Sequence, residues 1–218
     1  MKKRGHFCHV CGRHRANEKF SGKGHAKHIC KDCNREHRAK VRARKREFDS
    51  RVVFVQVMAR PERKVLVKRA VSASDYFEYC KEVGCEAWDI LKAVPGGCGE
   101  PIGMWLPPSM RPAGTSVYVQ GVEVSVGYDG DIPEGLDLVT LPAGWLMVFQ
   151  GPAYDDARFG EAIAVVQKAI KKFDPQLYGY EWAEDDAPRV QWEPVGKRGY
   201  IEALPVRPGE SLGIAHWV

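Results

Sequence analysis

The sequence contains no apolar run of about 18 residues, the length that a membrane-spanning helix requires, so no span is expected. The basic residues at positions 2–4 are not followed by an apolar stretch, and we therefore expect no secretory signal there. No motif in the sequence shows an obvious pair of a catalytic nucleophile and a base. Three of the seven cysteines, Cys80, Cys85 and Cys98, fit no spaced pattern. We interpret them as reduced thiols, which predicts a cytoplasmic protein.

The other four cysteines form two C-x₂-C pairs separated by 18 residues: Cys8 and Cys11, then Cys30 and Cys33. Thiolates at this spacing close a tetrahedral site, and the predicted cofactor is structural Zn²⁺ in a zinc ribbon, with a turn at residues 21–24. Four protein ligands leave no open position for water, so zinc catalysis is not expected. Iron in a rubredoxin-like site is an alternative. A site of three cysteines and one histidine also stays open, because three histidines lie nearby: His9, His25 and His28.

Charge is divided unevenly along the chain. Residues 1–51 contain 17 Lys or Arg and 5 Asp or Glu, a net charge of +12, whereas residues 52–218 contain 16 and 23, a net charge of −7. Four thiolates with one zinc ion would lower the first value by about two units, and the contrast would remain. The division predicts two modules with different partners, of which the first favours anions.

A basic helix is predicted from residue 32 to about residue 48, where Gly and Pro are absent and Arg, Lys, Ala and Glu dominate. Basic residues recur along one side of it at helical spacing: Arg35, Arg38, Arg42 and Lys45. They form a candidate surface for the phosphates of nucleic acid, bound without sequence specificity. A solvated linker and a protein-docking module are the alternatives. We place this module, zinc ribbon and basic helix, at residues 1–46.

Residues 52–218 form a second domain with two similar rounds of strand and helix patterns. The first round has a helix from Ser72 or Ser74 to residue 94 and strands at 52–58, 64–68, 102–106 and 116–126. The second has a helix from Asp155 or Asp156 and strands at 144–150, 178–182, 189–192 and 200–206. We predict an α+β fold: a duplicated strand-helix-strand-strand unit with an antiparallel sheet, two covering helices and a cleft between the halves.

Five stretches of this domain carry a family resemblance: DYFEYC at 75–80, PIGMWLP at 101–107, VYVQGVE at 117–123, LPAG at the start of 141–151, and RGYIEALPV at 198–206. They are similar to the GyrI-like effector-binding domain, the ligand-sensing module of many AraC- and MerR-type bacterial regulators. The resemblance covers residues 52–207. The family's usual helix-turn-helix domain is replaced here by the cysteine-rich module, so sequence-specific promoter control is not implied.

The resemblance implies a central aromatic pocket and an acidic residue on the final strand that faces cationic or lipophilic ligands. Glu202 matches that acidic position, and Trp105 and Tyr118 match pocket positions. Strand alternation places Tyr200 on the same face as Glu202. The remaining candidate walls are Trp145, Tyr180 and Trp182. Among aromatic rings, burial would raise the pKa of the Glu202 carboxyl, and a bound cation would pair with it while the rings add cation–π attraction.

Two functions follow from these residues. The first is a regulatory small-molecule sensor for an amphipathic or cationic ligand, docked on nucleic acid or protein through its N-terminal module. The second, implied by the resemblance, is a hydrolase of reactive xenobiotics such as cyclopropane-bearing compounds, with Glu202 as base and Tyr118 shaping the pocket. A third interpretation, an interaction scaffold, predicts a pocket filled by the protein's own side chains.

Overall fold

The computed structural model describes residues 5–209, without the side chains of residues 23–25. The chain divides into two compact units, Met1–Arg51 and Val52–Val218, and each is described separately. Within residues 5–209, no helix combines the length and the apolar character that crossing a membrane requires.

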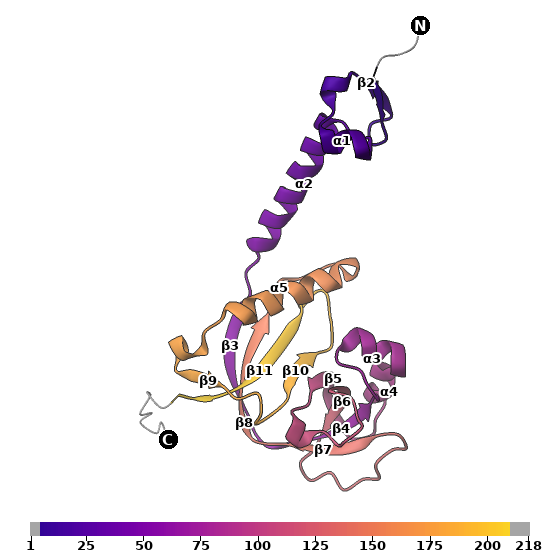
Figure 1. The fold of residues 1–218 in the computed structure, drawn as a ribbon. Coiled ribbons are helices and arrows are strands. Elements are labelled where there is room, and N and C mark those ends of the chain that lie inside the picture. Colours follow the sequence, from indigo (N-terminus) through magenta and orange to yellow (C-terminus); the bar gives the residue numbers. More distant parts are fainter. Residues whose placement is uncertain (1–4, 210–218) are drawn as a thin grey trace. The chain divides into compact units, whose positions relative to one another are not determined.

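The first unit consists of a hairpin followed by short and long helices (Figure 1). Its elements are β1 (His6–Cys8), β2 (Arg13–Arg15), η1 (Asn17–Lys19), α1 (Gly22–Lys27) and α2 (Lys31–Asp49). The predicted basic helix is present as α2 and extends to Asp49. The predicted turn at 21–24 is wrong, because α1 begins at Gly22 and residues 22–24 are helical.

The core of the first unit is very small. Its buried cluster comprises Cys8, Phe20 and Cys30, with Cys11 and Cys33 packed against it. A cluster of this size buries too little apolar surface to offset the conformational entropy lost on folding. The cysteines are therefore both the core of this unit and its candidate metal ligands.

The second unit is a nine-stranded antiparallel sheet with α-helices packed on it. The first half contains β3 (Phe54–Arg60), β4 (Arg63–Arg69), α3 (Tyr76–Val83), α4 (Ala87–Lys92), β5 (Gly97–Trp105) and β6 (Tyr118–Val124). The second half contains β7 (Asp137–Leu141), β8 (Gly144–Gln150), α5 (Phe159–Lys172), β9 (Tyr180–Trp182), β10 (Arg189–Trp192) and β11 (Ile201–Pro208).

The sheet shows that the two halves are repeats of one motif. The strand order is β3-β8-β11-β10-β5-β6-β4-β7, with β9 paired to β11. Exchanging β3 with β7, β4 with β8, β5 with β10 and β6 with β11 reverses this order onto itself. A pseudo-twofold axis therefore passes between β5 and β10. The duplicated α+β fold that the GyrI-like resemblance implies is confirmed, with β7 as an additional strand that the sequence pattern did not predict.

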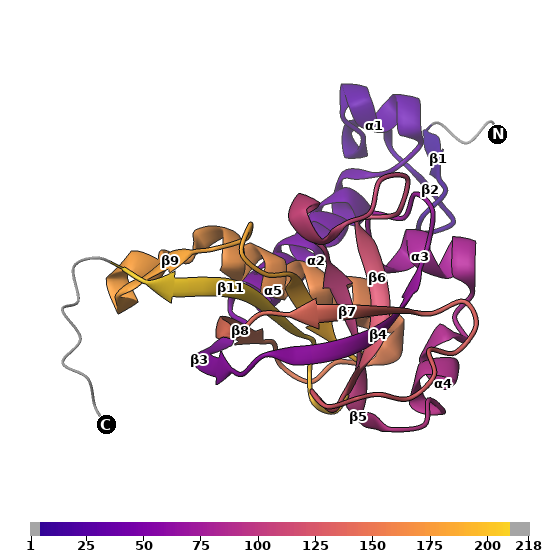
Figure 2. The same cartoon turned by 90° about the horizontal axis from the view of Figure 1, so that it is seen from below.

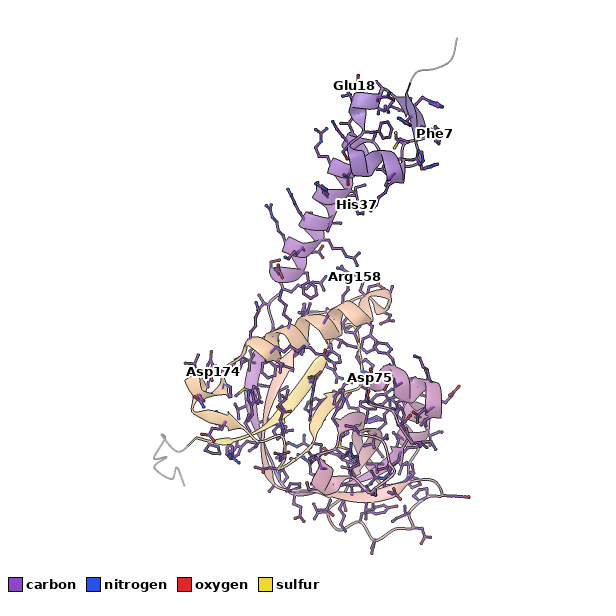
Figure 3. All side chains as sticks on the ribbon, in the orientation of Figure 1. Phe7, Glu18, His37, Asp75, Arg158 and Asp174 are labelled. Carbon is purple, nitrogen blue, oxygen red and sulfur yellow. The ribbon has the colours of Figure 1, made fainter. Side chains whose placement is uncertain are left out.

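The single helix predicted from residue 72 or 74 to residue 94 is two helices. Gly84, whose φ is 96°, ends α3, because glycine adopts that backbone conformation without steric cost. The chain turns and begins again as α4 at Ala87. The N-cap of α3 is Asp75, which is labelled in Figure 3. Its carboxylate accepts a hydrogen bond of 2.9 Å from the backbone N–H of Glu78.

The helices cover one face of the sheet. α3 and α4 pack on β5 and β6, and α5 lies across the strands that include β8 and β11 (Figure 1). The other face holds an apolar cluster that joins Val65 and Val67 of β4 to Leu146 and Val148 of β8. Because β4 and β8 are not neighbours in the sheet, the sheet curves around this cluster; Figure 2 shows β3, β4, β7 and β8 from below. The helix-covered face is where the predicted pocket residues lie.

Candidate functional site

The four cysteines of the first unit form a compact cluster. Their Sγ atoms all lie within 4.8 Å of one another, and those of Cys8 and Cys33 are 3.9 Å apart. Four thiolates bound to zinc at about 2.3 Å lie about 3.8 Å from one another in a tetrahedron. The cluster therefore has dimensions that suit a tetrahedral thiolate site for a metal ion.

Local structure explains how the two C-x₂-C pairs converge. Gly12, with a φ of 65°, lets the chain fold back so that its N–H donates to the Cys8 carbonyl at 2.9 Å. Cys30 is the N-cap of α2, and Cys33 lies in the first turn of that helix. The N-terminus of a helix carries a partial positive charge, which favours thiolates there.

The thiols differ in how easily they ionise. Burial opposes ionisation of Cys8, but the backbone N–H groups of Cys30, Cys11 and Val10 outweigh it and lower the pKa of Cys8 to about 6. A hydrogen bond with Cys30, followed by burial, raises the pKa of Cys33 to about 12. Four neighbouring thiolates repel one another, so a dication is the chemical partner that allows all of them to ionise.

The histidine alternative receives no support from the described residues. The cluster is made of the four cysteines alone. The rings of His9 and His28 pack against each other, with centroids 5.3 Å apart. The side chain of His25 lies outside the described part of the chain.

The predicted basic stripe is exposed on α2. Arg35, Arg38 and Arg42, with Lys31, Asn34, Ala39 and Ser21, line a surface hollow of about 550 Å³, and Lys45 continues the stripe beyond it. Arg35 pairs with Asp32 at 3.2 Å. Within residues 5–209, no carboxylate pairs with Arg38 or Arg42. These guanidinium groups are therefore available to anions.

In the second unit, a row of polar side chains crosses the middle of the helix-covered face. Cross-strand pairing places Gln120 beside Gly103, Gly103 opposite Gln191, and Gln191 opposite Glu202. Paired residues project from the same face of a sheet. Gln120 and Glu202 have 0% of their surface exposed and Gln191 has 1%. The predicted acidic residue is thus fully buried at the centre of the domain.

The Glu202 carboxylate is held by residues from its own strand and from β10. The Tyr200 hydroxyl donates a hydrogen bond of 2.7 Å to Oε2, and the Arg189 guanidinium forms an ion pair with Oε1. Burial raises the pKa of Glu202, and Arg189, Tyr200 and Gln167 of α5 oppose part of that rise. Burial and the nearby Glu202 raise the pKa of Tyr200 as well, so Tyr200 acts as a hydrogen-bond donor.

Aromatic rings cover this row. Phe159 of α5 contacts Tyr76 of α3, with ring centroids 5.5 Å apart, and lies 6.1 Å from Tyr200. On the other side, the rings of Trp105 and Tyr118 meet edge to face at 4.9 Å. The first turns of α3 and α5 thus place aromatic side chains beside Tyr200, the residue that donates a hydrogen bond to the buried glutamate.

Several buried polar atoms in this region are unused. Within the part of the chain that the structure describes, no hydrogen-bond partner contacts the Tyr118 hydroxyl, either end of the Gln120 amide or the amide nitrogen of Gln191. Burial raises the pKa of Tyr118 well above its ordinary value, and Gln120 opposes the rise without a well-formed hydrogen bond. Unpartnered polar atoms in a protein interior are costly, and they commonly mark a site for a ligand or a water molecule.

The structure brings some of the predicted pocket residues together and separates others. Trp105, Tyr118 and Tyr200 gather around Glu202 as described above. Trp182 lies opposite Val206, and so does Trp145, four positions along β11 from Glu202 and hence about 13 Å away along the strand. The Trp182 ring packs near Phe149. Trp145 and Trp182 therefore lie at the far end of the strands.

No pattern in the sequence marks Arg189 or Gln191 as site residues. Both lie on β10, a strand of four residues that was predicted with its correct bounds. The alternation of Tyr118 with Gln120 was visible in the sequence, and it places Gln120 on the pocket face. Arg189 could not be identified from the local sequence pattern, because its partners Trp105 and Glu202 lie on other strands and meet it only in the folded protein.

Comparison with known proteins gives only distant likenesses. No protein-family model matches the chain, and no curated protein matches it. A solved structure of SAV2435 bound to tetraphenylphosphonium is 15% identical, with a TM-score of 0.47, over 71% of this chain and 94% of that one. The EcmrR C-terminal domain is 15% identical, with a TM-score of 0.42, over 73% and 99%. A hydrolase from Listeria innocua is 13% identical, with a TM-score of 0.39, over 75% and 97%.

Proposed function

We propose that the second unit is a regulatory small-molecule sensor that binds an amphipathic cation at Glu202. The observation that supports this most directly is a fully buried carboxylate under aromatic rings, already paired with a cationic group. A bound cation is the ligand that stabilises such a carboxylate best, and the rings add cation–π attraction of about 0.5–2 kcal/mol. The unused amide group of Gln120 and the unused amide nitrogen of Gln191 supply hydrogen bonds for polar parts of the ligand.

The test is a thermal-shift titration of the full chain with tetraphenylphosphonium as the lipophilic-cation probe. A ligand present at a hundredfold excess over its Kd should stabilise the folded state by about 2.7 kcal/mol. We expect saturable stabilisation of the wild type and none of Glu202→Gln. The matched control is Glu123→Gln, because that carboxylate lies on β6 and is paired with Arg60 at 2.7 Å, outside the row.

A second function remains open for the same residues. A raised pKa suits a general base, and Glu202 has one. The alternative is therefore a hydrolase of cyclopropane-bearing electrophiles, in which Glu202 activates water and Tyr118 shapes the pocket. Mass spectrometry of the ligand after incubation separates the two: an unaltered ligand supports a sensor, and a hydrolysed ligand formed by wild type but not by Glu202→Gln supports an enzyme. A protein that binds no cation and turns over no electrophile would be the interaction scaffold.

For the first unit we propose a zinc ribbon that docks on nucleic acid in the cytoplasm. The cysteine cluster matches the thiolate spacing of zinc. α2 contains eight Lys or Arg and four Asp or Glu, and the guanidinium groups of Arg38 and Arg42 border an open hollow. Such a surface neutralises backbone phosphates and carries no base-reading contacts, so we expect binding without sequence preference.

Fluorescence anisotropy of labelled DNA and RNA duplexes, measured over a range of salt concentrations, tests this docking. The Gln variant of Arg35, Arg38 and Arg42 should bind more weakly and flatten the log–log salt dependence by up to about 2.7 units. Replacing Lys171, Lys172 and Arg207 of the second unit by Gln removes the same charge. That variant should bind with nearly the affinity and salt dependence of wild type. Equal effects of the two triple variants would mean that net charge alone attracts the nucleic acid. An absence of binding by wild type would favour protein docking.

A further inference from the structure

The Arg189 side chain occupies the place that a cationic ligand would take. Arg189 on β10 lies opposite Trp105 of β5, and its guanidinium carbon is 4.6 Å from the centroid of the Trp105 ring. The same guanidinium pairs with the Glu202 carboxylate. The protein's own chain thus supplies both contacts expected for a bound organic cation: a charge partner and an aromatic face.

The Trp105 ring is held in position independently of Arg189. Its indole N–H donates a hydrogen bond of 2.9 Å to the Ser74 carbonyl, in the segment just before α3. The Trp105 ring also meets the ring of Tyr118 edge to face at 4.9 Å, and Tyr118 is fully buried. The aromatic surface would therefore persist if Arg189 moved away.

Arg189 makes fewer hydrogen bonds than Arg198, another paired arginine of this domain. The Arg198 guanidinium makes two hydrogen bonds to the Glu100 carboxylate, of 2.6 and 2.7 Å, and a third to the Glu193 carbonyl. The Nε atoms of both arginines are buried and have no hydrogen-bond partner among residues 5–209. The difference lies in the terminal nitrogens, where Arg189 has the ion pair with Glu202 in place of the three hydrogen bonds of Arg198. A guanidinium has five N–H donors, so this occupant leaves much of its bonding capacity unused.

Arg189 also has a route out of the site. Its side chain is 27% exposed, whereas that of Glu202 is completely buried. Rotation of the Arg189 side chain toward solvent would leave Glu202 as an uncompensated buried charge, which is strongly unfavourable. The ionised form of Glu202 therefore requires a cation beside it, and a cationic ligand can take that place only in exchange for Arg189.

We propose that Arg189 is a built-in occupant of the cation site, and that the site selects planar, delocalised cations of the guanidinium or amidinium class that replace it on Glu202 and Trp105. A planar cation stacks on the Trp105 face and donates N–H groups to the Glu202 carboxylate. A quaternary ammonium or phosphonium ion has no N–H donor and would pair with that carboxylate by charge alone, so it should bind more weakly than a planar cation that donates N–H groups. The ligand class in this inference rests on the proposed function, because it assumes that the second unit binds a cation. The role of Arg189 as the built-in occupant can be tested separately.

The experiment is chemical rescue of Arg189→Ala in the full chain, with benzamidinium as the probe. We expect the variant to have a lower Tm than wild type, and millimolar benzamidinium to raise that Tm saturably. Isothermal titration should show at least about tenfold tighter binding to the variant than to wild type, because no side chain competes. Tetramethylammonium should have no effect on either protein. If Arg189→Ala does not fold, Arg189→Gln serves the same purpose.

Two variants define the controls. Arg189→Ala combined with Glu202→Gln should lose the rescue, because the charge partner is gone. Arg207→Ala removes an exposed arginine that pairs with Glu181 at 3.5 Å. Its affinity for benzamidinium and its Tm response should equal those of wild type. Equal benzamidinium affinity for wild type and Arg189→Ala, or rescue that survives loss of Glu202, would overturn the proposal.

The outcomes also separate this proposal from the proposed function. If tetraphenylphosphonium binds wild type through Glu202 but benzamidinium does not rescue Arg189→Ala, the sensor stands and the role of Arg189 is overturned. If rescue occurs while wild type binds no cation, Arg189 is the occupant and the sensor function fails.

Discussion

The Tyr118 hydroxyl lies directly over the α-carbon of Gly103, on the neighbouring strand. A β-carbon at position 103 would be 2.1 Å from that hydroxyl oxygen and 2.8 Å from the ring carbon that carries it. Glycine at this position therefore creates the space that the phenol fills. The Tyr118 side chain therefore covers the part of the sheet that a side chain at position 103 would otherwise occupy.

Replacing Gly103 by Ala should destabilise the domain. Neither the buried ring nor the strand backbone can give way by the required distance, and overpacking of this kind costs about 1–3 kcal/mol. Urea unfolding followed by tryptophan fluorescence measures the change. Gly144→Ala is the matched control: Gly144 also lies in a strand, and a β-carbon added there would meet no atom of another residue within 4 Å beyond its chain neighbours. If both variants were equally unstable, steric contact with Tyr118 would not be the cause.

The unpartnered amide of Gln120 predicts an unusual stabilising substitution. Gln120→Leu removes a buried donor and acceptor that have no partner among the described residues, so the free energy of unfolding should rise by about 1 kcal/mol. Gln150→Leu should act in the opposite direction, because the Gln150 amide donates a 2.7 Å hydrogen bond to the Arg198 carbonyl. Denaturant unfolding of both variants checks the contrast. Destabilisation by Gln120→Leu would indicate that a water or another group satisfies that amide.

Much of the fold could be predicted because its elements carry strong local signals. The spacing of Phe159, Ile163 and Val166 predicts α5, and the strand at 144–150 was predicted with its observed bounds. The helix break at Gly84 was missed because the apolar pattern continues through it. β7 was missed because Asp137–Leu141 is a short strand at the edge of the sheet, with few buried residues.

The site could be predicted only in part, for a physical reason. Glu202 and Tyr200 lie two positions apart on one strand, so alternation alone places them together. The contact of Arg189 with Trp105 depends on the register between β10 and β5, strands far apart in the sequence. Sequence periodicity specifies which face a residue occupies but not which strand lies beside it.

The buried carboxyl of Glu202 should make stability depend on pH. Burial raises its pKa above the ordinary value of 4.5, so its favourable contribution is fully present below that value and is lost as pH rises through the folded-state pKa. The stability of wild type relative to Glu202→Gln should therefore fall as pH increases from about 4 toward 8, by at most about 1.4 kcal/mol per pH unit. Urea unfolding across this range tests it. Parallel pH profiles for the two proteins would show that Glu202 titrates as in the unfolded chain.

Removing Arg189 should extend to higher pH the range over which protonation of Glu202 affects stability. Arg189 is the group that most strongly opposes the effect of burial on the pKa of Glu202, so in Arg189→Gln the carboxyl should stay protonated to a higher pH. The loss of stability would then begin at the same pH, which the unfolded chain sets, and would continue to a higher pH. Infrared absorption of the protonated carboxyl, compared between Arg189→Gln and wild type, provides a direct measurement. An unchanged titration would mean that the ion pair contributes little to the charge state of Glu202.

Metal removal should unfold the first unit and leave the second intact. The buried cluster of the first unit contains two of the four candidate ligands, Cys8 and Cys30, so losing the metal removes the constraint on its core. We expect elemental analysis to find about one zinc ion per chain, and chelation to make residues 6–33 sensitive to protease while residues 54–208 stay resistant. Cys30→Ser should reproduce the chelated state, and Cys85→Ser, which changes an exposed free thiol, should not. Iron in place of zinc would identify the rubredoxin-like alternative. A protease-resistant first unit without any metal would show that Cys8, Phe20 and Cys30 suffice as a core.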